Sequence, residues 1–247
     1  NEGFKVYYQP IWHSDTGTYQ SAEALLRFCD VTTLGFVSPE EFIPIAERKG
    51  MIKQIGEMVF SKVCQFIHDN DIGKYGVDFI EVNLSGVQCV DRRLSSQFMK
   101  IMEKNEVRPD QIDLEVTETA AIAGREALLG NIAELSANGV SFAMDDFGTG
   151  FSNIAMIANI PYDYIKFDKS LIWMAFEDVP DEKKVGMLED MIRLIVRFGK
   201  KIIAEGIETK EMQDFLIKNG VTHFQGYYHS RPVPGEEYIR FIAGRNV

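Results

Sequence analysis

Residues 141–168 read SFAMDDFGTGFSNIAMIANIPYDYIKFD, and this segment contains a structural unit that recurs along the chain. It opens with a short apolar run over 141–144, continues with helical spacing over 153–158 and ends with a second apolar run over 164–167. Two strands joined by a helix predict parallel pairing, because a parallel strand needs a crossover to return to the same end of the sheet. The segment therefore predicts an α/β fold.

The same alternation of strand and helix continues on both sides of this segment. Short apolar runs predict the strands, which cover 4–12, 19–28, 79–84, 112–116, 141–144, 164–167, 201–204 and 222–225. Ser38 and Pro39 are typical of a helix start. The remaining predicted helices cover 52–70, 92–105, 121–138, 153–158, 182–198, 210–219 and 235–242.

Eight strands in this arrangement predict a closed barrel. The first two flank Asp15-Thr16-Gly17, a turn signal, so we expect a hairpin whose first strand runs antiparallel to the rest. The predicted fold class is α/β, a TIM-like (β/α)8 barrel with an antiparallel first strand. Such barrels form one unit, so we expect residues 1–247 to be a single domain. Because the chain starts at Asn1 rather than Met, we interpret it as one module of a larger multidomain protein.

Composition and charge exclude several classes of protein. Hydrophobic residues make up 45% and charged residues 26%, which is typical of a globular chain and not of a disordered one. A net charge of −11 argues against binding to a nucleic-acid polymer. Three cysteines without a CxxC pair favour a reducing compartment over a disulfide framework. No apolar run reaches the ~18 residues of a transmembrane helix, so we expect a cytoplasmic domain or the cytoplasmic part of a membrane-anchored protein.

Polar and charged side chains stand near the C-terminal ends of the predicted strands, where α/β barrels build their active sites. They are Glu23, which lies inside the second strand, and Asn83, Glu115, Glu118, Asp145, Asp146, Lys166, Glu205 and Gln225. Six carboxylates in one cleft repel one another unless cations balance them. Carboxylate and amide oxygens suit Mg²⁺ or Mn²⁺, and two ions sharing one aspartate would use the whole set.

Two divalent ions and a lysine in an acidic cleft indicate phosphate chemistry. No Ser/His/Asp or Cys/His arrangement is visible, and the four histidines have no HExxH spacing, which favours direct attack by water. Asp145-Asp146-Phe147-Gly148 alone would also suit a protein kinase, but the other kinase motifs are missing. A Mg²⁺-dependent barrel of another type, such as an enolase-type lyase, would also place carboxylates at strand ends.

Ten short motifs, in order along the chain, carry a family resemblance. They are YQPI (8–11), EALLR (23–27), PEEFIPI (39–45), VNLS (82–85), EVTET (115–119), DDFGTGFS (145–152), IKFDKS (165–170), AEGIET (204–209), QGYY (225–228) and SRP (230–232). In these motifs the chain resembles the EAL-domain phosphodiesterases, which hydrolyse the bacterial second messenger cyclic di-GMP. The resemblance spans roughly residues 4–242.

The resemblance implies a role for each matching residue. The metal ligands would be Glu23, Asn83, Glu115, Asp145, Asp146 and Glu205, with Asp145 shared by two Mg²⁺ or Mn²⁺ ions. Lys166 would hold the attacking water, and Glu205 is either a ligand or the general base. Glu118 would anchor the loop over 147–152, with support from Glu208. Contacts with the dinucleotide would come from Gln9, Arg27, Pro39, Asp168 and Gln225, and the product would be linear pGpG.

The resemblance also implies partners and one alternative function. Family members commonly follow sensor or GGDEF domains and often pair, so we expect a homodimer and an N-terminal regulatory domain. Some relatives are catalytically silent receptors that bind cyclic di-GMP without cleaving it. Those relatives lack metal or lysine positions, whereas this chain retains the full set, which favours the enzyme.

Overall fold

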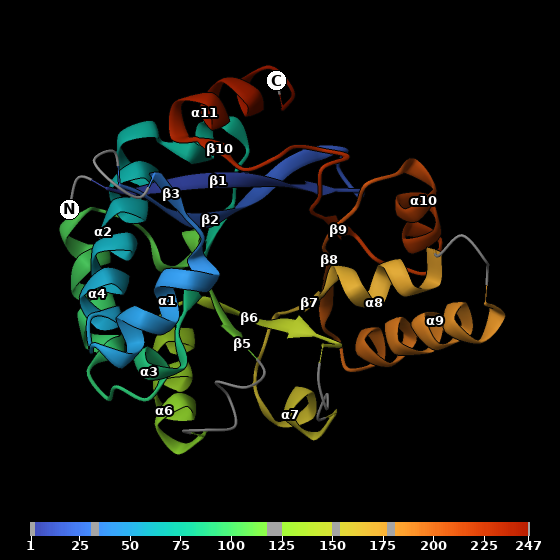
Figure 1. Ribbon diagram of the computed structural model, residues 1–247, viewed down its shortest axis with the longest axis horizontal. Helices are drawn as coiled ribbons and strands as arrows, with labels where there is room; N and C mark the ends of the chain where they lie inside the picture. Colours follow the sequence, from blue (N-terminus) through green and yellow to red (C-terminus); the bar gives the residue numbers. More distant parts are fainter. Residues whose placement is uncertain (1–2, 31–34, 118–124, 150–153, 177–180, 247) are drawn as a thin grey trace.

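The structure is a computed structural model of the chain, and it describes residues 3–30, 35–117, 125–149, 154–176 and 181–246 (Figure 1). In that part of the chain, eight strands pair side by side in a closed ring, in the order β1-β9-β8-β7-β6-β5-β4-β2, and β2 pairs again with β1. The strands of the ring are β1 (Phe4–His13), β2 (Thr18–Asp30), β4 (Phe79–Leu84), β5 (Ile112–Thr117), β6 (Ser141–Phe147), β7 (Tyr164–Phe167), β8 (Lys201–Ala204) and β9 (His223–Phe224). The predicted barrel is confirmed.

Strand β1 is antiparallel to both of its neighbours in the ring, β2 and β9, while the other neighbouring strands pair in parallel. This confirms the predicted hairpin and antiparallel first strand. Two short strands extend the sheet outside the ring, where β3 (Gly35–Val37) pairs with β2 and β10 (Val233–Pro234) pairs with β1. The sequence analysis did not predict these two strands.

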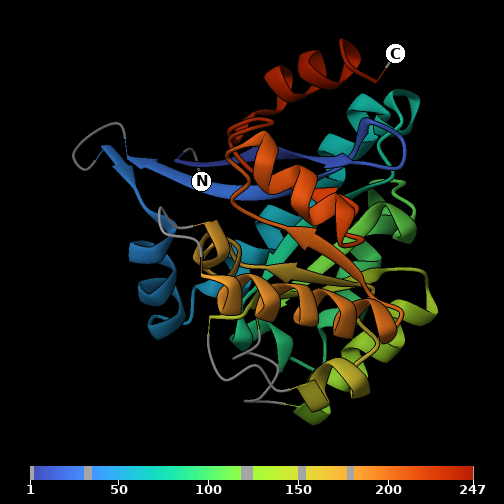
Figure 2. The ribbon, with the colours of Figure 1, turned by 90° about the vertical axis from the view of Figure 1, so that its right-hand side faces the viewer.

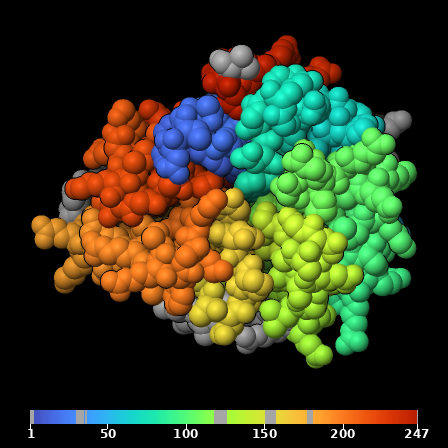
Figure 3. Space-filling model, turned by 180° about the vertical axis from the view of Figure 1, so that it is seen from behind, coloured from blue at the N-terminus to red at the C-terminus, as the bar shows by residue number. Residues whose placement is uncertain are grey.

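Helices surround the ring, with the cyan and green segments on one side and the orange segments on the other (Figures 1 and 2). Most lie where the sequence predicts them: α1 (Pro39–Arg48), α2 (Ile52–Asn70), α4 (Leu94–Lys104), α6 (Arg125–Ala137), α7 (Ile154–Asn159), α9 (Glu182–Arg197), α10 (Lys210–Lys218) and α11 (Gly235–Ala243). The structure adds α3 (Gly86–Cys89), α8 (Lys169–Trp173) and three 3₁₀ turns, η1 (Ile72–Tyr75), η2 (Pro109–Gln111) and η3 (Met174–Phe176). Seen from behind, a blue segment of the first two strands is framed by cyan, orange and red segments (Figure 3).

The hydrophobic core has two parts. The larger cluster lies between the strands and the surrounding helices and includes the stacked rings of Phe60 in α2 and Phe98 in α4. The smaller one is a separate apolar layer within the ring, made of Ile11, Phe79, Ala143, Tyr164 and Ile203. Because alternate side chains of a strand face the same side, the next inward position on each strand lies directly beyond this layer. Those positions carry the candidate site.

No helix in the described part of the chain combines the length and the apolar character that crossing a membrane requires.

Candidate functional site

The site consists of the inward-facing positions just beyond the apolar layer. Two residues from each apolar-layer side chain lie Gln9, Glu81, Asp145, Lys166 and Glu205. Cross-strand register completes the set, because Glu23 lies opposite both Gln9 and Glu81, and Glu115 lies opposite Asn83. The barrel therefore brings these polar residues together from seven different strands.

Lys166 is the centre of the site, and its side chain is only 1% exposed. Its Nζ lies 2.7 Å from Glu115 Oε1 and 2.9 Å from Glu205 Oε1. Three more carboxylates lie slightly farther from Nζ, with Glu23 Oε2 at 3.5 Å, Glu81 Oε2 at 3.6 Å and Asp145 Oδ1 at 3.9 Å. One ammonium thus faces five carboxyl groups, and four negative charges remain if all of them are ionised.

A hydrogen-bonded row of amides holds Glu23 in place. Asn83 Nδ2 donates to Glu23 Oε1 at 2.7 Å, and Gln225 Nε2 donates to Glu23 Oε2 at 2.6 Å. Gln225 also donates to Gln9 Oε1 at 3.0 Å, while Gln9 donates to the carbonyl of Ser230 at 3.1 Å. Burial acts to raise the pKa of Glu23, but Lys166 and the two amides outweigh it and hold that pKa below its usual value. Glu23 is therefore the anionic anchor of the site.

The pKa values of the other acids shift in the opposite direction, because too little positive charge lies near these groups to offset their burial. Burial is the largest cause in each case, and it raises the pKa of Asp145 and, by a wide margin, that of Glu115, although Lys166 opposes the shift. It also raises the pKa of Glu205 to about 8. Burial, followed by the charge of Asp145, raises the pKa of Asp146 to about 6. This cluster binds protons readily, and it would bind other cations for the same reason.

The end of β6 is shaped to present two adjacent aspartates. The β6–β7 register is irregular between Met144 and Phe147, and Asp146 has φ +59°, in the left-handed region. In a regular strand neighbouring side chains point to opposite faces, but here Asp145 and Asp146 both line the same cleft. The left-handed turn of the backbone at Asp146 therefore accompanies the pairing of the two carboxylates.

Two adjoining clefts open at this end of the barrel. The acidic cleft, of about 290 Å³, is lined by polar residues that include Gln9, Glu23, Asp145, Asp146, Glu205, Glu208 and Gln225. The neighbouring cleft, of about 340 Å³, is lined by Arg27, Pro39 and Asn83 among others. Glu23 and Leu25 line both clefts, so they are contiguous.

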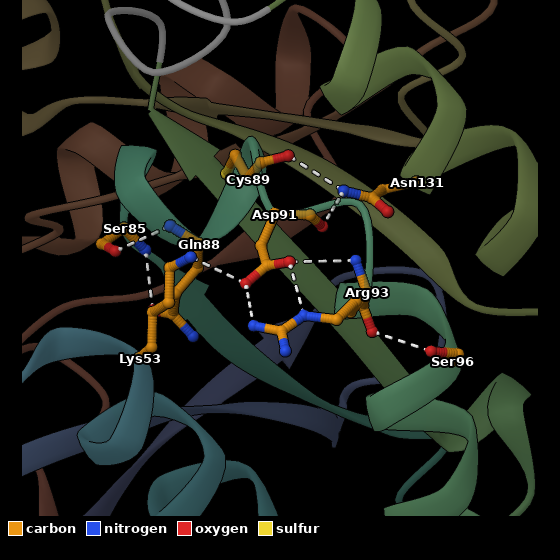
Figure 4. Close-up of polar contacts among 8 residues, drawn as sticks. All are labelled: Lys53, Ser85, Gln88, Cys89, Asp91, Arg93, Ser96 and Asn131. Atoms are coloured by element: carbon orange, nitrogen blue, oxygen red, sulfur yellow. Dashed lines mark hydrogen bonds and ion pairs between the residues drawn. The ribbon is translucent and has the colours of Figure 1, made fainter.

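The segment after β4, the strand that carries Asn83, makes polar contacts with helices α2 and α6 and contains α3 (Figure 4). Ser85 and Gln88 form a capping box at α3, and Lys53 of α2 bonds Asp91 Oδ2 at 2.7 Å. Asn131 of α6 donates to the carbonyls of Cys89 and Asp91 at 3.0 and 2.9 Å. Because these contacts fix this segment, Asn83 is held next to Glu23.

The donor set suits a hard divalent cation. Since Asn83 uses its amide nitrogen on Glu23, its Oδ1 is left as a potential ligand. Glu115 Oε2 is buried without a hydrogen-bond partner, which a cation would correct. Oxygen ligands of this kind fit Mg²⁺ or Mn²⁺. No three Asp, Glu, His or Cys side chains of the described chain converge on a single ion position, and the Lys166 ammonium lies between the carboxylates instead.

A model of the EAL domain family matches residues 1–232 of this chain. The chain belongs to the EAL domain family.

Relatives of this EAL domain carry informative names. The bifunctional diguanylate cyclase/cyclic di-GMP phosphodiesterase MucR of Pseudomonas aeruginosa is 33% identical over 238 residues, which cover 96% of the chain and 34% of MucR. The cyclic di-GMP phosphodiesterase PdeL of Escherichia coli is 31% identical over 97% of the chain and 65% of PdeL. The chain spans about a third of the length of the first curated relatives that it matches.

Solved structures share the fold of this EAL domain. The PaMucR phosphodiesterase in complex with c-di-GMP superposes with a TM-score of 0.88 at 32% identity, covering 96% of this chain and 94% of that one. The EAL enzyme Bd1971, in its form with cAMP and cyclic di-GMP bound, gives a TM-score of 0.89 at 28% identity over 98% of this chain and 65% of that one. The family and the barrel fold predicted from sequence are both confirmed.

The predicted site residues of the EAL domain fall into three groups. Most line the two clefts or contact Lys166, as described above. Asp168 instead caps α8, accepting a hydrogen bond from the Ser170 backbone nitrogen at 2.8 Å, and Glu118 lies outside the described residues. Their predicted roles, and the assignment of individual ligands, stay predictions.

The sequence analysis missed two acids inside this EAL domain. Glu81 is fully buried, neither of its oxygens has a hydrogen-bond partner, and burial raises its pKa. Asp113 is equally buried, and burial followed by the charge of Glu81 raises its pKa well above the usual value. Strand alternation could have found both, since Glu81 is two residues from Asn83 and Asp113 is two residues from Glu115.

Proposed function

We propose that this EAL domain hydrolyses cyclic di-GMP to linear pGpG by attack of a metal-activated water. The observation that carries the proposal is the convergence of five carboxyl groups on the buried ammonium of Lys166, at the mouth of a barrel. Relatives whose names state cyclic di-GMP phosphodiesterase activity cover nearly the whole chain. Active sites of α/β barrels lie at the C-terminal ends of the strands, which is where these carboxyl groups stand.

The residues that would hold metal ions follow from the donor set. Glu23, Asn83, Glu115 and Asp145 would bind one ion, and Asp145, Asp146 and Glu205 a second. Two divalent cations would balance the four negative charges that the central ammonium leaves uncompensated. When bound, such ions lower the pKa of water and offset the charge of a phosphate group.

The chain's own residues would position the reactants and move a proton. Lys166, held by Glu115 and Glu205, would donate a hydrogen bond to the attacking water and fix its direction. In the metal-free chain, burial raises the pKa of Glu205 to about 8, so this carboxyl accepts a proton close to neutral pH. Glu205 would either bind the second ion or act as the general base, and as the base it would take the proton of the attacking water on the oxygen that does not face Lys166.

The dinucleotide would lie across the two contiguous clefts. Gln9 and Gln225 stand beside the acids, while Arg27 and Pro39 line the neighbouring cleft. Arg27 would pair with the phosphodiester that is not being cleaved, because a guanidinium matches two phosphate oxygens.

Turnover of cyclic di-GMP by the purified chain tests the proposal, with Mg²⁺, with Mn²⁺ and with EDTA. We expect pGpG to form only with metal. Asp145→Asn should lower turnover by about 100-fold or more, because it weakens both ion sites at once. Asp190→Asn is the matched control on α9, because the Asp190 side chain is 77% exposed. Turnover by this variant should equal that of the parent. Saturable binding without turnover would support the silent receptor instead.

A further inference from the structure

A cationic pocket lies beside the acidic cleft, on the β1–β2 ribbon. Its volume is about 430 Å³, and its lining includes Lys5, Tyr7, Arg27, Cys29, Tyr227 and Arg231. These residues come from β1, from β2 and from the segment that leads into β10, which carries Arg231. Figure 2 shows the blue strands β1 and β2 extending beyond the rest of the barrel. The pocket therefore combines three cations with two aromatic rings and one thiol.

Register places the pocket on the same face of the ribbon as the site. Lys5 lies opposite Arg27, and four residues farther along β1, Gln9 lies opposite Glu23. Side chains four residues apart share a face and are about 13 Å apart along a strand. Arg27 also lines the cleft that contains Pro39, and Tyr227 also lines the acidic cleft. The cationic pocket thus adjoins both clefts that the proposed substrate would occupy.

Two of the three cations, Lys5 and Arg231, line this pocket and neither of the two clefts, so they are available for a further anion. No carboxylate in the described part of the chain forms an ion pair with Lys5, Arg27 or Arg231. Arg27 Nη1 donates to the carbonyl of Leu26 at 3.0 Å, and the Arg231 guanidinium lies 4.0 Å from the ring centre of Tyr227. Burial lowers the pKa of Arg27, and the negative charge of Glu23 opposes that shift. In a chain of net charge −11, the group of cations without an ion pair is a local exception. Its field would attract an anion to the rim of an acidic cleft.

We infer that this pocket is a second, metal-independent binding site for a nucleotide. Lys5 and Arg231 take its phosphate by charge-assisted hydrogen bonds, and the rings of Tyr7 and Tyr227 contact its base, while Arg27 stands on the border with the cleft proposed for cyclic di-GMP. The site goes beyond the proposed function, because it lies outside the carboxylate cluster and needs no divalent ion. If the chain is a phosphodiesterase, the pocket is where an anionic nucleotide first meets the protein or is held next to the reacting one.

Binding of guanosine 5′-monophosphate to the full chain in EDTA tests this inference, with guanosine as the probe that lacks the phosphate. Calorimetry should show that the monophosphate binds more tightly and that added salt weakens it. Lys5→Ala and Arg231→Ala should each weaken binding of the monophosphate by about fivefold or more, which is the effect of losing one charge-assisted contact. Lys218→Ala and Arg197→Ala remove exposed cations elsewhere and should change nothing. Equal affinity for the two probes, or unchanged affinity in both pocket variants, would overturn the inference.

Cys29 gives an independent readout from inside the pocket. It is partly exposed, whereas Cys64 and Cys89 are fully buried, so a neutral alkylating reagent should label Cys29 selectively in the folded chain. Saturating guanosine 5′-monophosphate should slow that labelling, and Arg231→Ala should restore the rate. Labelling that is as fast with the nucleotide as without it would contradict the inference.

Failure of the inference can be told apart from failure of the proposed function. Protection of Cys29 without any turnover of cyclic di-GMP would refute only the proposed activity and would support the pocket. Metal-dependent turnover with neither protection nor phosphate-dependent binding would refute only the pocket.

Discussion

At the scale of single residues, Lys166 controls the charge of the site. It is the one ammonium within 4 Å of the five described carboxyl groups that surround it, and these acids hold its pKa well above the usual value although burial opposes the shift. Removing one partner from such a buried group leaves the others uncompensated. The stability of the metal-free chain should therefore depend strongly on this side chain.

Lys166→Met keeps most of the side-chain volume and removes the charge. In EDTA at pH 8 we expect a loss of about 3–5 kcal/mol in the free energy of unfolding. The loss should be smaller at pH 5, because acids with raised pKa values, such as Glu205 at about 8, are then protonated. Urea unfolding at the two pH values measures this, with Lys218→Met as the control. Equal losses at both pH values would contradict the electrostatic explanation.

For Glu81 we expect the opposite effect, namely that removing its charge stabilises the metal-free chain. Its carboxyl is fully buried without a hydrogen-bond partner, and its burial raises its pKa. Glu81→Gln preserves the shape and removes a charge that the site cannot balance without metal. We expect the metal-free variant to melt at a higher temperature than the parent at pH 8, and the difference to be smaller at pH 5, because burial raises the pKa of Glu81. A lower melting temperature at both pH values would mean that the acid is needed for structure.

These residues also show what the sequence could and could not predict about the site. Glu115, Asp145, Lys166 and Glu205 were found because each stands near the end of a predicted strand, and the barrel brings strand ends together. Glu23 lies inside the second predicted strand and was found because its apolar neighbours predict a buried carboxylate, which needs a partner. Glu81 was missed because it lies inside its strand rather than at the end, although strand alternation from Asn83 places it on the same face. Ion pairs with Lys166 depend on side-chain positions, which strand order alone does not specify.

At the scale of elements, the polar contacts after β4 connect a helix to the site. Gly56 of α2 packs against Gln88, the residue that closes the capping box of α3, and a Cβ at Gly56 would lie 2.0 Å from Gln88 Nε2. The side chain of Gln88 is buried, so it has little space to move away. The segment that begins at Ser85, directly after the strand that carries Asn83, therefore depends on a glycine in a different element.

Gly56→Ala tests this dependence. We expect a loss of about 1–3 kcal/mol in the free energy of unfolding, because overpacking would displace Gln88 from the cap. Gly73→Ala is the matched control, since no atom lies within 4 Å of the added Cβ and its φ is not in the left-handed region. Thermal unfolding compares the two variants. An equal effect of both substitutions would show that helix propensity, rather than the contact with Gln88, is responsible.

The length of an element decided whether the sequence could predict it. All eight strands of the ring were predicted, because each is part of an apolar run that is followed or preceded by a turn signal. Strands β3 and β10, of three and two residues, are too short to show a period, and their pairing depends on β1 and β2. Helices α3 and α8, of four and five residues, are held by caps at Ser85 and Asp168 rather than by an apolar stripe.

At the scale of the whole molecule, the two ends of the barrel interior have opposite dependences on pH. At the mouth, the pKa values of Asp146 and Glu205 are raised to about 6 and about 8, so the folded chain binds more protons than the unfolded chain above pH 4.5. Stability of the metal-free chain should therefore fall as pH rises from 7 to 8. Glu205→Gln should reduce this fall, which urea unfolding in EDTA would show. An unchanged slope would mean that Glu205 is ionised throughout this range.

The other end of the barrel contains His13 and His223, whose ring centres are 4.1 Å apart. Burial lowers the pKa of His13 to about 4 and that of His223 to about 3, with Lys201 facing both rings, and Gln20 and Asp15 acting on His13 in the opposite direction. Below pH 6.5 the unfolded chain therefore binds more protons at these sites, and their contribution to stability falls as pH falls.

His223→Gln isolates this contribution. The stability of the parent relative to the variant should decline by about 2 kcal/mol between pH 7 and pH 4.5, because only the parent must keep a neutral imidazole buried there. His68→Gln is the matched control, since it replaces a histidine outside the buried pair, whose side chain is 48% exposed. Urea unfolding across this range measures both differences. A constant difference for His223→Gln would show that this histidine becomes protonated within the folded barrel at its ordinary pKa, which would require water or a carboxylate to reach the His13–His223 pair.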